Sequence, residues 1–271
     1  MPTITINGTR YAFVDEGEGP LILFGHGLLA SREMFRAQID ALKDRYRCVS
    51  IDWPGHGDSG WRQEGFSFYD LADDAAALVP TLGAERAVFA GLSQGAMIFM
   101  RLALAHPELL DALILMDASA APEPEDTKPR YEQMAIALRD GSEEQRREVV
   151  PLVQRVLYGR TWLERDPEGA AHEREVILGH PREGVYLAWR AVADRDDIRG
   201  RIGEITAPSL VICGAEDVAT PPDRAREIQA AIGGAELVWI PEAGHHSPIE
   251  NPAVVTEAIE MFLERVTSAR T

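Results

Sequence analysis

Short apolar runs alternate along the chain with longer segments in which apolar residues recur every three or four positions. The first pattern is typical of β-strands and the second of amphipathic helices. Two early runs flank Asn7-Gly8, a strong hairpin signal. The later runs are almost continuously apolar, as in strands that helices cover on both faces. The predicted strands are Ile4–Ile6, Tyr11–Val14, Leu21–Phe24, Arg47–Asp52, Ala87–Ala90, Ala112–Asp117, Ser209–Cys213 and Leu237–Ile240. The predicted helices span residues 31–43, 68–82, 94–105, 222–232 and 252–266. This alternation predicts an α/β fold with a mainly parallel, eight-stranded sheet between helices.

One long segment breaks the alternation. Residues 122–205 contain no convincing strand, only a charged helical pattern interrupted by proline and glycine. The segment begins in a connector rich in proline and acidic residues, which is typical of an exposed boundary. We therefore predict a helical cap at 122–205, inserted into a core formed by residues 1–121 and 206–271.

Composition and charge narrow the class of protein. The 271 residues are 45% hydrophobic and 26% charged, which is typical of a soluble globular chain large enough for a sizeable core. The net charge of −17 argues against binding to nucleic acid or to an anionic membrane. The N-terminus lacks a basic segment followed by an apolar one, so we expect a cytoplasmic protein.

Cysteine and histidine usage gives no sign of a metal or a disulfide. Cys48 and Cys213 both fall in predicted strands, where they are expected to be small core residues in a reducing compartment. No cysteine and histidine cluster has the spacing of a zinc site. We expect neither a metal nor another cofactor.

A serine stands between a predicted strand and the helix that follows it, in the sequence Gly-Leu-Ser-Gln-Gly at Gly91–Gly95. A turn this tight strains the backbone at Ser93, and small residues are needed two positions to either side. The turn lifts the hydroxyl clear of the sheet and places it at the N-terminus of a helix, whose N–H groups and dipole favour negative charge. Ser93 is therefore the candidate nucleophile.

A serine nucleophile needs a base and an acid that orients the base. In a parallel α/β sheet such groups lie just past the carboxyl ends of strands. His245 follows the last predicted strand, and His246 beside it is expected to be a solvent-facing or capping neighbour. Asp217, in a glycine turn after the strand at 209–213, is the favoured acid because of its loop; Asp117, which ends the strand at 112–117, is the alternative.

An oxyanion hole requires backbone donors near the nucleophile. One is expected to be the N–H of Gln94, directly after the serine, and the other an N–H from the loop after the strand at 21–24. That loop, Gly25–Leu29, contains two glycines that allow close backbone approach, and Leu28 is the residue whose N–H would point inward.

Five motifs occur in an order that resembles the α/β-hydrolase superfamily. They are Gly25–Gly27, Asp52–Ser59, Gly91–Gly95, Gly214–Asp217 and Gly244-His245, and together they span the chain outside the insertion. The resemblance implies a triad of Ser93, His245 and Asp217, with Leu28 and Gln94 as oxyanion donors. In the family order the nucleophile comes first and the histidine last.

Histidines elsewhere in the chain are expected to be structural. His26 and His56 precede the nucleophile, so the family order makes them turn-stabilising residues. His106, His172 and His180 lie at helix ends or in the insertion and are predicted to be on the surface.

Within the superfamily the chain is similar to small bacterial carboxylesterases and to the 3-oxoadipate enol-lactonase-like branch. The segment Gly184–Val192, followed by Asp196-Asp197, suggests that branch. The resemblance implies a serine hydrolase that cleaves a small, largely apolar ester or lactone. Alternatives with the same triad are a C–C bond hydrolase of ring-cleavage products and a cofactor-free perhydrolase. An alternative outside the enzymes is a non-catalytic receptor for a small molecule, and the intact triad disfavours it.

The substrate pocket is expected under the cap. Its predicted lining residues are Leu29, Tyr186, Trp189 and Val218. A lactone that bears a carboxylate would need an inward-facing arginine, because guanidinium groups bind carboxylates in a bidentate manner. The cap offers Arg130, Arg155, Arg190 and Arg195 for that role.

Overall fold

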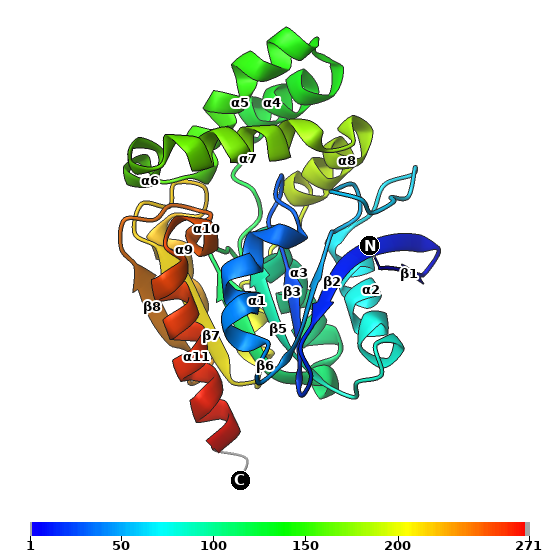
Figure 1. Cartoon of the computed structure of the whole chain (residues 1–271), viewed down its shortest axis with the longest axis vertical. Helices are drawn as coiled ribbons and strands as arrows, with labels where there is room; N and C mark the ends of the chain where they lie inside the picture. The colour runs from blue at the N-terminus through cyan, green and yellow to red at the C-terminus, as the bar shows by residue number, and fades with distance from the viewer. Residues whose placement is uncertain (1, 269–271) are drawn as a thin grey trace.

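The computed structural model describes residues 2–268, and its strands form one eight-stranded sheet (Figure 1). In chain order the strands are β1 (Thr3–Ile6), β2 (Thr9–Glu16), β3 (Leu21–Gly25), β4 (Arg47–Ile51), β5 (Ala87–Leu92), β6 (Leu110–Met116), β7 (Ser209–Gly214) and β8 (Glu236–Ile240). The spatial order is β1-β2-β4-β3-β5-β6-β7-β8. The hairpin β1–β2 and the pair β2–β4 are antiparallel, and all other neighbours are parallel. The predicted α/β sheet is therefore confirmed.

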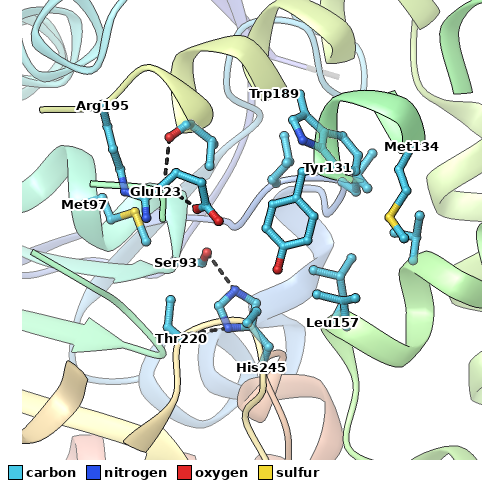
Figure 2. A pocket seen from close by; sticks show the side chains of 16 residues that line it. Ser93, Met97, Glu123, Tyr131, Met134, Leu157, Trp189, Arg195, Thr220 and His245 are labelled. Carbon is cyan, nitrogen blue, oxygen red and sulfur yellow. Dashed lines mark hydrogen bonds and ion pairs between the residues drawn. The ribbon is translucent and has the colours of Figure 1, made fainter. Parts of the chain in front are cut away.

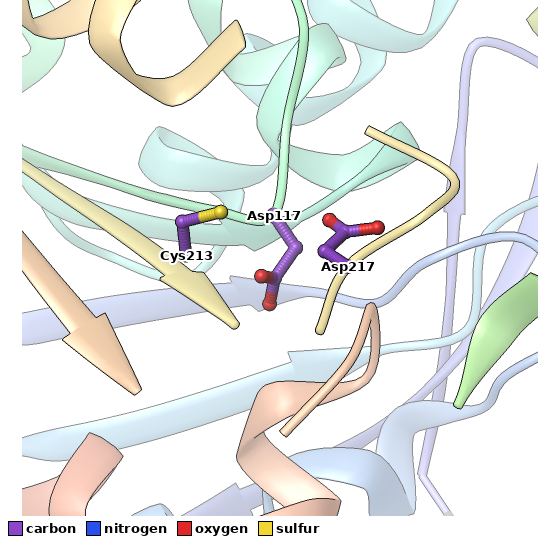
Figure 3. A group of neighbouring side chains, drawn as sticks. All are labelled: Asp117, Cys213 and Asp217. Atoms are coloured by element: carbon purple, nitrogen blue, oxygen red, sulfur yellow. The ribbon is translucent and has the colours of Figure 1, made fainter. Parts of the chain in front are cut away.

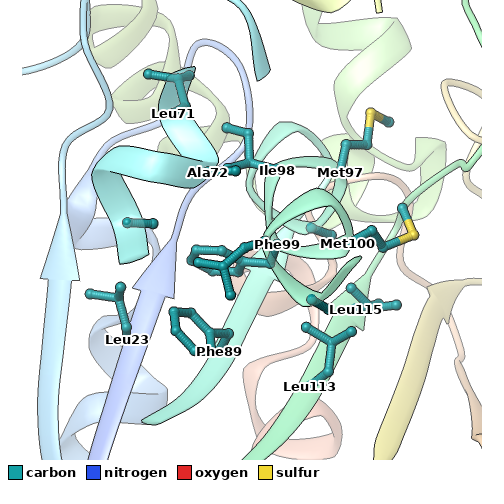
Figure 4. Close-up of a cluster of buried hydrophobic side chains, with 14 of the residues drawn as sticks. Leu23, Leu71, Ala72, Phe89, Met97, Ile98, Phe99, Met100, Leu113 and Leu115 are labelled. Atoms are coloured by element: carbon teal, nitrogen blue, oxygen red, sulfur yellow. The ribbon is translucent and has the colours of Figure 1, made fainter. Parts of the chain in front are cut away.

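Helices cover both faces of the sheet because its strands are apolar on both sides. One face packs against α1 (Arg36–Leu42) and α11 (Pro252–Ser268), and the other against α2 (Phe68–Thr81), α3 (Gln94–Ala105) and α9 (Pro222–Ala231). Neighbouring residues of a strand enter opposite cores, as Val88 and Phe89 do. Figure 4 shows the second core, where Phe89 of β5 and Phe99 of α3 contact each other with ring centroids 5.2 Å apart.

The predicted helix at 31–43 is divided in two. A 3₁₀ turn at Arg32–Phe35 precedes α1, and the side chain of Ser31 accepts a hydrogen bond from the backbone of Glu33 at its start. Asp52 and Asp117, predicted to end their strands, lie just beyond β4 and β6. Both acids consequently belong to loops at the carboxyl edge of the sheet.

Five helices stand between β6 and β7 and sit on one end of the body, as Figure 1 shows. They are α4 (Lys128–Asp140), α5 (Glu143–Leu157), α6 (Arg160–Arg165), α7 (Pro167–Gly179) and α8 (Arg182–Ala193). They enclose an apolar cluster of their own, which includes Met134, Val150, Trp162 and Trp189. We refer to these five helices as the cap.

The turn between β5 and α3 has the strained backbone that its sequence predicts. Ser93 has φ 50° and ψ −113°, and its N–H donates to the carbonyl oxygen of Met116 over 2.8 Å. A Cβ atom on Gly95 would lie 2.0 Å from the carbonyl oxygen of Gly25. Glycine at 95 therefore lets α3 start directly against β3.

Replacing Gly95 tests this contact. Gly95→Ala should lower the free energy of unfolding by about 2 kcal/mol or more, because the clash is with backbone that cannot rotate away. Gly179→Ala is the control: its Cβ would meet nothing within 4 Å, and removing a glycine should leave stability unchanged or raise it by up to ~1 kcal/mol. Urea unfolding followed by circular dichroism measures both. Equal stability of the two variants would contradict this account.

Candidate active site

Three side chains from distant segments form one chain of hydrogen bonds. Ser93 Oγ lies 2.7 Å from His245 Nε2, and His245 Nδ1 lies 2.9 Å from Asp217 Oδ2. All three are buried, with 3–8% of their surface exposed. Figure 2 shows Ser93 and His245 side by side at the edge of a cavity. The structure thus brings together the three residues that the sequence singled out.

The loop after β7 holds Asp217 in place. Its Oδ1 accepts hydrogen bonds from the backbone of Ala219 and Thr220, at 2.8 and 2.9 Å, and its Oδ2 accepts one from the Thr220 hydroxyl at 2.7 Å. Burial disfavours the charged form of His245, but the charge and hydrogen bond of Asp217, together with the charges of Asp117 and Glu250, outweigh it and raise the pKa of the imidazole above its ordinary value. Asp217 can therefore both orient His245 and stabilise its protonated form.

Asp117, the alternative acid, lies close to Asp217 but contacts other groups. Its Oδ1 accepts a hydrogen bond from the backbone of Gly214 over 2.7 Å, and its Oδ2 accepts one from the Ser247 hydroxyl. It ties the loop after β7 to the loop after β8. Burial and the charge of Asp217 raise the pKa of Asp117 well above its usual value.

Asp117, Cys213 and Asp217 could in principle offer ligand atoms to a metal, since these atoms lie within 4.8 Å of one another (Figure 3). Their chemistry fits a metal poorly. Both carboxylates already accept hydrogen bonds on each oxygen. Burial raises the pKa of the Cys213 thiol, whereas metal ligation needs the thiolate. The hydrogen bonds of these residues are better suited to holding neighbouring loops together than to binding a metal.

Two backbone N–H groups near Ser93 have no acceptor among the described residues. Within the described residues, neither Leu28 nor Gln94 donates its backbone N–H to another group. Leu28 lines the same cavity as Ser93, and Gln94 begins α3 directly after the serine. A developing oxyanion would give both donors an acceptor.

His26 and His56 support the loop that carries Leu28. His26 Nε2 accepts a hydrogen bond from the backbone of Trp53 over 3.0 Å, and His56 Nε2 accepts one from the backbone of Leu29 over 3.1 Å. Both rings are fully buried, and this burial lowers the pKa of His26 to about 4. The structure therefore gives them the turn-stabilising contacts that were expected.

Two other histidines, His246 and His180, are buried, although His180 was predicted to be on the surface and His246 to be a solvent-facing or capping residue. His246 is fully buried, and its ring lies edge-on to that of Tyr158 in the cap, with centroids 4.7 Å apart. His180 is 6% exposed and accepts a hydrogen bond from the backbone of Gly57 over 3.1 Å. The surface prediction for His180 was wrong, because this histidine of the cap packs against Gly57 and His56 of the body. His246 does not face solvent, but it is the capping residue at the start of the helix Ser247–Glu250.

A narrow cavity, partly open to solvent, lies above Ser93. Leu29 and Trp189 line it, as predicted. Tyr186 and Val218 do not: Tyr186 donates its hydroxyl to Glu132 outside the cavity, and Val218 is 61% exposed beside a neighbouring hollow. The cap contributes most of the apolar wall, through Met134, Val153, Val156, Leu157, Trp189 and Val192.

Glu123, Tyr131 and Arg195 bring polar side chains to this cavity, and of these the sequence had offered only Arg195 as a candidate. Glu123 and Arg195 form an ion pair of 2.9 Å, with each side chain about a tenth exposed or less. The Arg195 guanidinium also donates to the carbonyl oxygens of Ala121 and Val192. Tyr131 of α4 lines the same cavity. Of the four cap arginines considered from sequence, Arg195 is the one that lines the cavity, and its charge is paired.

Sequence reasoning also missed Glu250, which connects the base loop to the cap. Its Oε2 accepts hydrogen bonds from the backbones of Gly244 and Gly159, both at 2.8 Å, and its Oε1 accepts one from the backbone of His246 at 2.9 Å. Burial raises the pKa of Glu250 to about 7, although these hydrogen bonds favour the carboxylate. A glutamate in a four-residue helix has no periodic pattern by which the sequence could have revealed it.

Comparison with known proteins places this geometry in a family. Residues 20–252 match the family of the α/β hydrolase fold. The chain belongs to the α/β-hydrolase family. A thermophilic esterase from Thermogutta terrifontis has 31% sequence identity and a TM-score of 0.89, with 98% of this chain and 99% of that chain covered. The enol-lactonase from Burkholderia xenovorans LB400 has 28% identity and a TM-score of 0.89, with 97% and 100% covered.

A third relative is named for a reaction other than ester or lactone hydrolysis. A protein of Agrobacterium fabrum, provisionally named carbamate hydrolase RutD, is 27% identical over 252 residues, which are 92% of this chain and 94% of that protein. These similarities identify this α/β hydrolase as a hydrolytic enzyme. Among its described helices, none is both long and apolar enough to cross a bilayer.

The two acids can be distinguished by the reactivity of Ser93. A fluorophosphonate should label Ser93, as peptide mapping would detect. Asp217→Asn should slow the labelling on the order of 10³-fold, because the amide turned toward Nδ1 forces the wrong imidazole tautomer. Asp117→Asn, the matched control, should stay within about threefold, since its remaining oxygen can still accept from Gly214. The reverse ranking would make Asp117 the orienting acid.

Proposed function

We propose that this α/β hydrolase cleaves a small, largely apolar carboxylic ester or lactone by way of an acyl-enzyme. The observation that carries the proposal is the hydrogen-bonded chain from Ser93 through His245 to Asp217 beside an apolar cavity. A serine hydroxyl is a weak nucleophile by itself and needs an adjacent base. The 2.7 Å contact between Ser93 Oγ and His245 Nε2 is within the reach required for that proton transfer.

The reaction proceeds in two acyl transfers. Ser93 Oγ attacks the carbonyl carbon while His245 takes its proton, and the carbonyl oxygen becomes an oxyanion that the N–H groups of Leu28 and Gln94 stabilise. The C–O bond to the alkoxy group then breaks, and His245 gives its proton to the leaving oxygen. Water gives a proton to His245 and attacks the acyl carbon; the bond from this carbon to Ser93 Oγ then breaks, His245 returns the proton to Ser93 Oγ, and the acid is released. Asp217 stabilises the imidazolium in both halves of the reaction.

The charges of the cavity favour an uncharged substrate. Arg195 could attract a carboxylate, but Glu123 lies 2.9 Å away and neutralises it. An anionic substrate would also approach a protein with a net charge of −17. The ester and lactone names of the structural neighbours agree with this substrate class. Carbamates belong in the same test, because their carbonyl can be attacked in the same way.

Ester hydrolysis by wild type and Ser93→Ala tests the proposal. p-Nitrophenyl acetate and butyrate should be hydrolysed with EDTA present, palmitate should be nearly inert because the cap limits the acyl chain, and Ser93→Ala should lose on the order of 10³-fold or more in kcat. Release of p-nitrophenol measures all of these, with a lactone and a carbamate followed by pH-stat. Undiminished turnover by Ser93→Ala would refute the nucleophile, and inactivity on every one of these substrates would refute the proposal.

The pH dependence follows from the position of His245. The base must be neutral to accept the serine proton, so kcat/KM falls as the pH drops below the pKa of the imidazole. Since Asp217 raises that pKa, the midpoint of the fall in kcat/KM on the acidic side should lie at a pH above the ordinary histidine pKa of about 6.5. A kcat/KM profile for p-nitrophenyl butyrate measures it, with circular dichroism at each pH to exclude unfolding. An acidic limb below the ordinary value would contradict the role given to Asp217.

A further inference from the structure

The hydroxyl of Tyr131 enters the cavity. Tyr131 lies on α4 of the cap and lines the cavity together with Ser93 and His245. In Figure 2 its hydroxyl points away from the cap, toward these two residues. Within the described residues it makes no hydrogen bond. Four other tyrosines donate to carboxylates: Tyr11 to Asp74, Tyr69 to Asp196, Tyr158 to Glu173 and Tyr186 to Glu132.

The other polar side chains at this end of the cavity are already engaged. The Thr220 hydroxyl donates to Asp217, and Arg195 is held by Glu123 and by two backbone carbonyl oxygens. Tyr131 also keeps its proton: burial and the nearby charge of Glu123 raise the pKa of the phenol, although Arg130 and Arg195 act against them. The cavity therefore holds a protonated donor that is free to bind an oxygen of a ligand.

An ester bound for attack has two oxygens that need partners. Its carbonyl oxygen would accept hydrogen bonds from the N–H groups of Leu28 and Gln94, on the side of the turn between β5 and α3. Its alkoxy oxygen must face His245 Nε2, from which it receives a proton. We propose that the Tyr131 hydroxyl, reaching in from the cap, donates a hydrogen bond to this leaving oxygen. This inference rests on the proposed function and adds a catalytic residue to it.

This role of Tyr131 does not change which groups transfer protons in the reaction. In acylation the bond from Ser93 Oγ to the carbonyl carbon forms and the C–O bond to the alkoxy group breaks. The serine proton passes through His245 to the alkoxy oxygen, and Tyr131 keeps its own proton while stabilising the negative charge that grows on that oxygen. In deacylation the attacking water occupies the same place, gives one proton to His245 and hydrogen-bonds to Tyr131.

A series of aryl butyrates tests the proposal, because these esters form the same butyryl-enzyme and differ in how much help the leaving oxygen needs. Tyr131→Phe and wild type are compared on p-nitrophenyl, phenyl and p-methylphenyl butyrate by kcat/KM, which reports the steps up to acylation. The loss in Tyr131→Phe should be about twofold or less for the p-nitrophenyl ester, whose oxygen leaves readily. It should grow to about tenfold for the p-methylphenyl ester, as expected for one lost hydrogen bond.

Tyr186→Phe is the matched control, since it removes a cap hydroxyl that donates to Glu132 outside the cavity. Its loss should be the same for all three esters. A loss in Tyr131→Phe that is equal across the series, including no loss, overturns the proposal and leaves the esterase assignment intact. If wild type hydrolyses none of the esters faster than Ser93→Ala, the proposed function itself fails and the role of Tyr131 fails with it.

Discussion

The site depends on the close approach of α3 to β3, which glycine alone permits at position 95. This approach allows the chain to turn directly from β5 into α3 with Ser93 at φ 50°. Such a conformation costs about 1–3 kcal/mol for a residue with a side chain. The hydrogen bond from Ser93 to Met116 and the burial of α3 against the sheet and α2 offset that cost. The strain is therefore held by the body of the fold, and the nucleophile has no freedom to relax.

Buried carboxylates hold the loops around this fixed serine. Burying a charged oxygen without partners is costly, so each acid here receives several hydrogen bonds. Asp217 accepts from its own loop, Asp117 joins the loops after β7 and β8, and Glu250 joins the base loop to the cap. Glu216 adds a further tie by accepting from the backbone of Thr161 over 2.9 Å. The base and the cap are consequently positioned by the same network.

Much of the body of the fold and the triad could be predicted from the sequence, because their signals are local. Apolar runs indicate buried strands, and Gly91 and Gly95 indicate the tight turn around Ser93 without information from the rest of the chain. A histidine or an acid that directly follows a strand must lie at the carboxyl edge of the sheet. Each of these inferences needs only a few neighbouring residues.

The cap was harder to predict because its contacts depend on how helices pack. Tyr186 and Trp189 are three residues apart on α8, so helical spacing alone puts them on one face, yet only Trp189 lines the cavity. Tyr131 had no distinguishing pattern on its polar helix. His246 was expected to face solvent or to cap a helix; it caps the helix Ser247–Glu250, and Tyr158 lies against its buried ring. Such placements are set by tertiary packing.

The cavity combines an apolar wall with balanced charge, and this balance has a physical origin. Arg195 is needed at the base of the cap, where it binds the carbonyl oxygens of Ala121 and Val192. An unpaired guanidinium there would be a strong anion site in a region of low dielectric. Glu123 removes that attraction, and the acidic surface opposes anions at longer range. In the mechanism that we propose, polar recognition is therefore left to uncharged groups, namely the two backbone N–H donors and the phenol of Tyr131, whose interactions would strengthen where an ester oxygen gains charge.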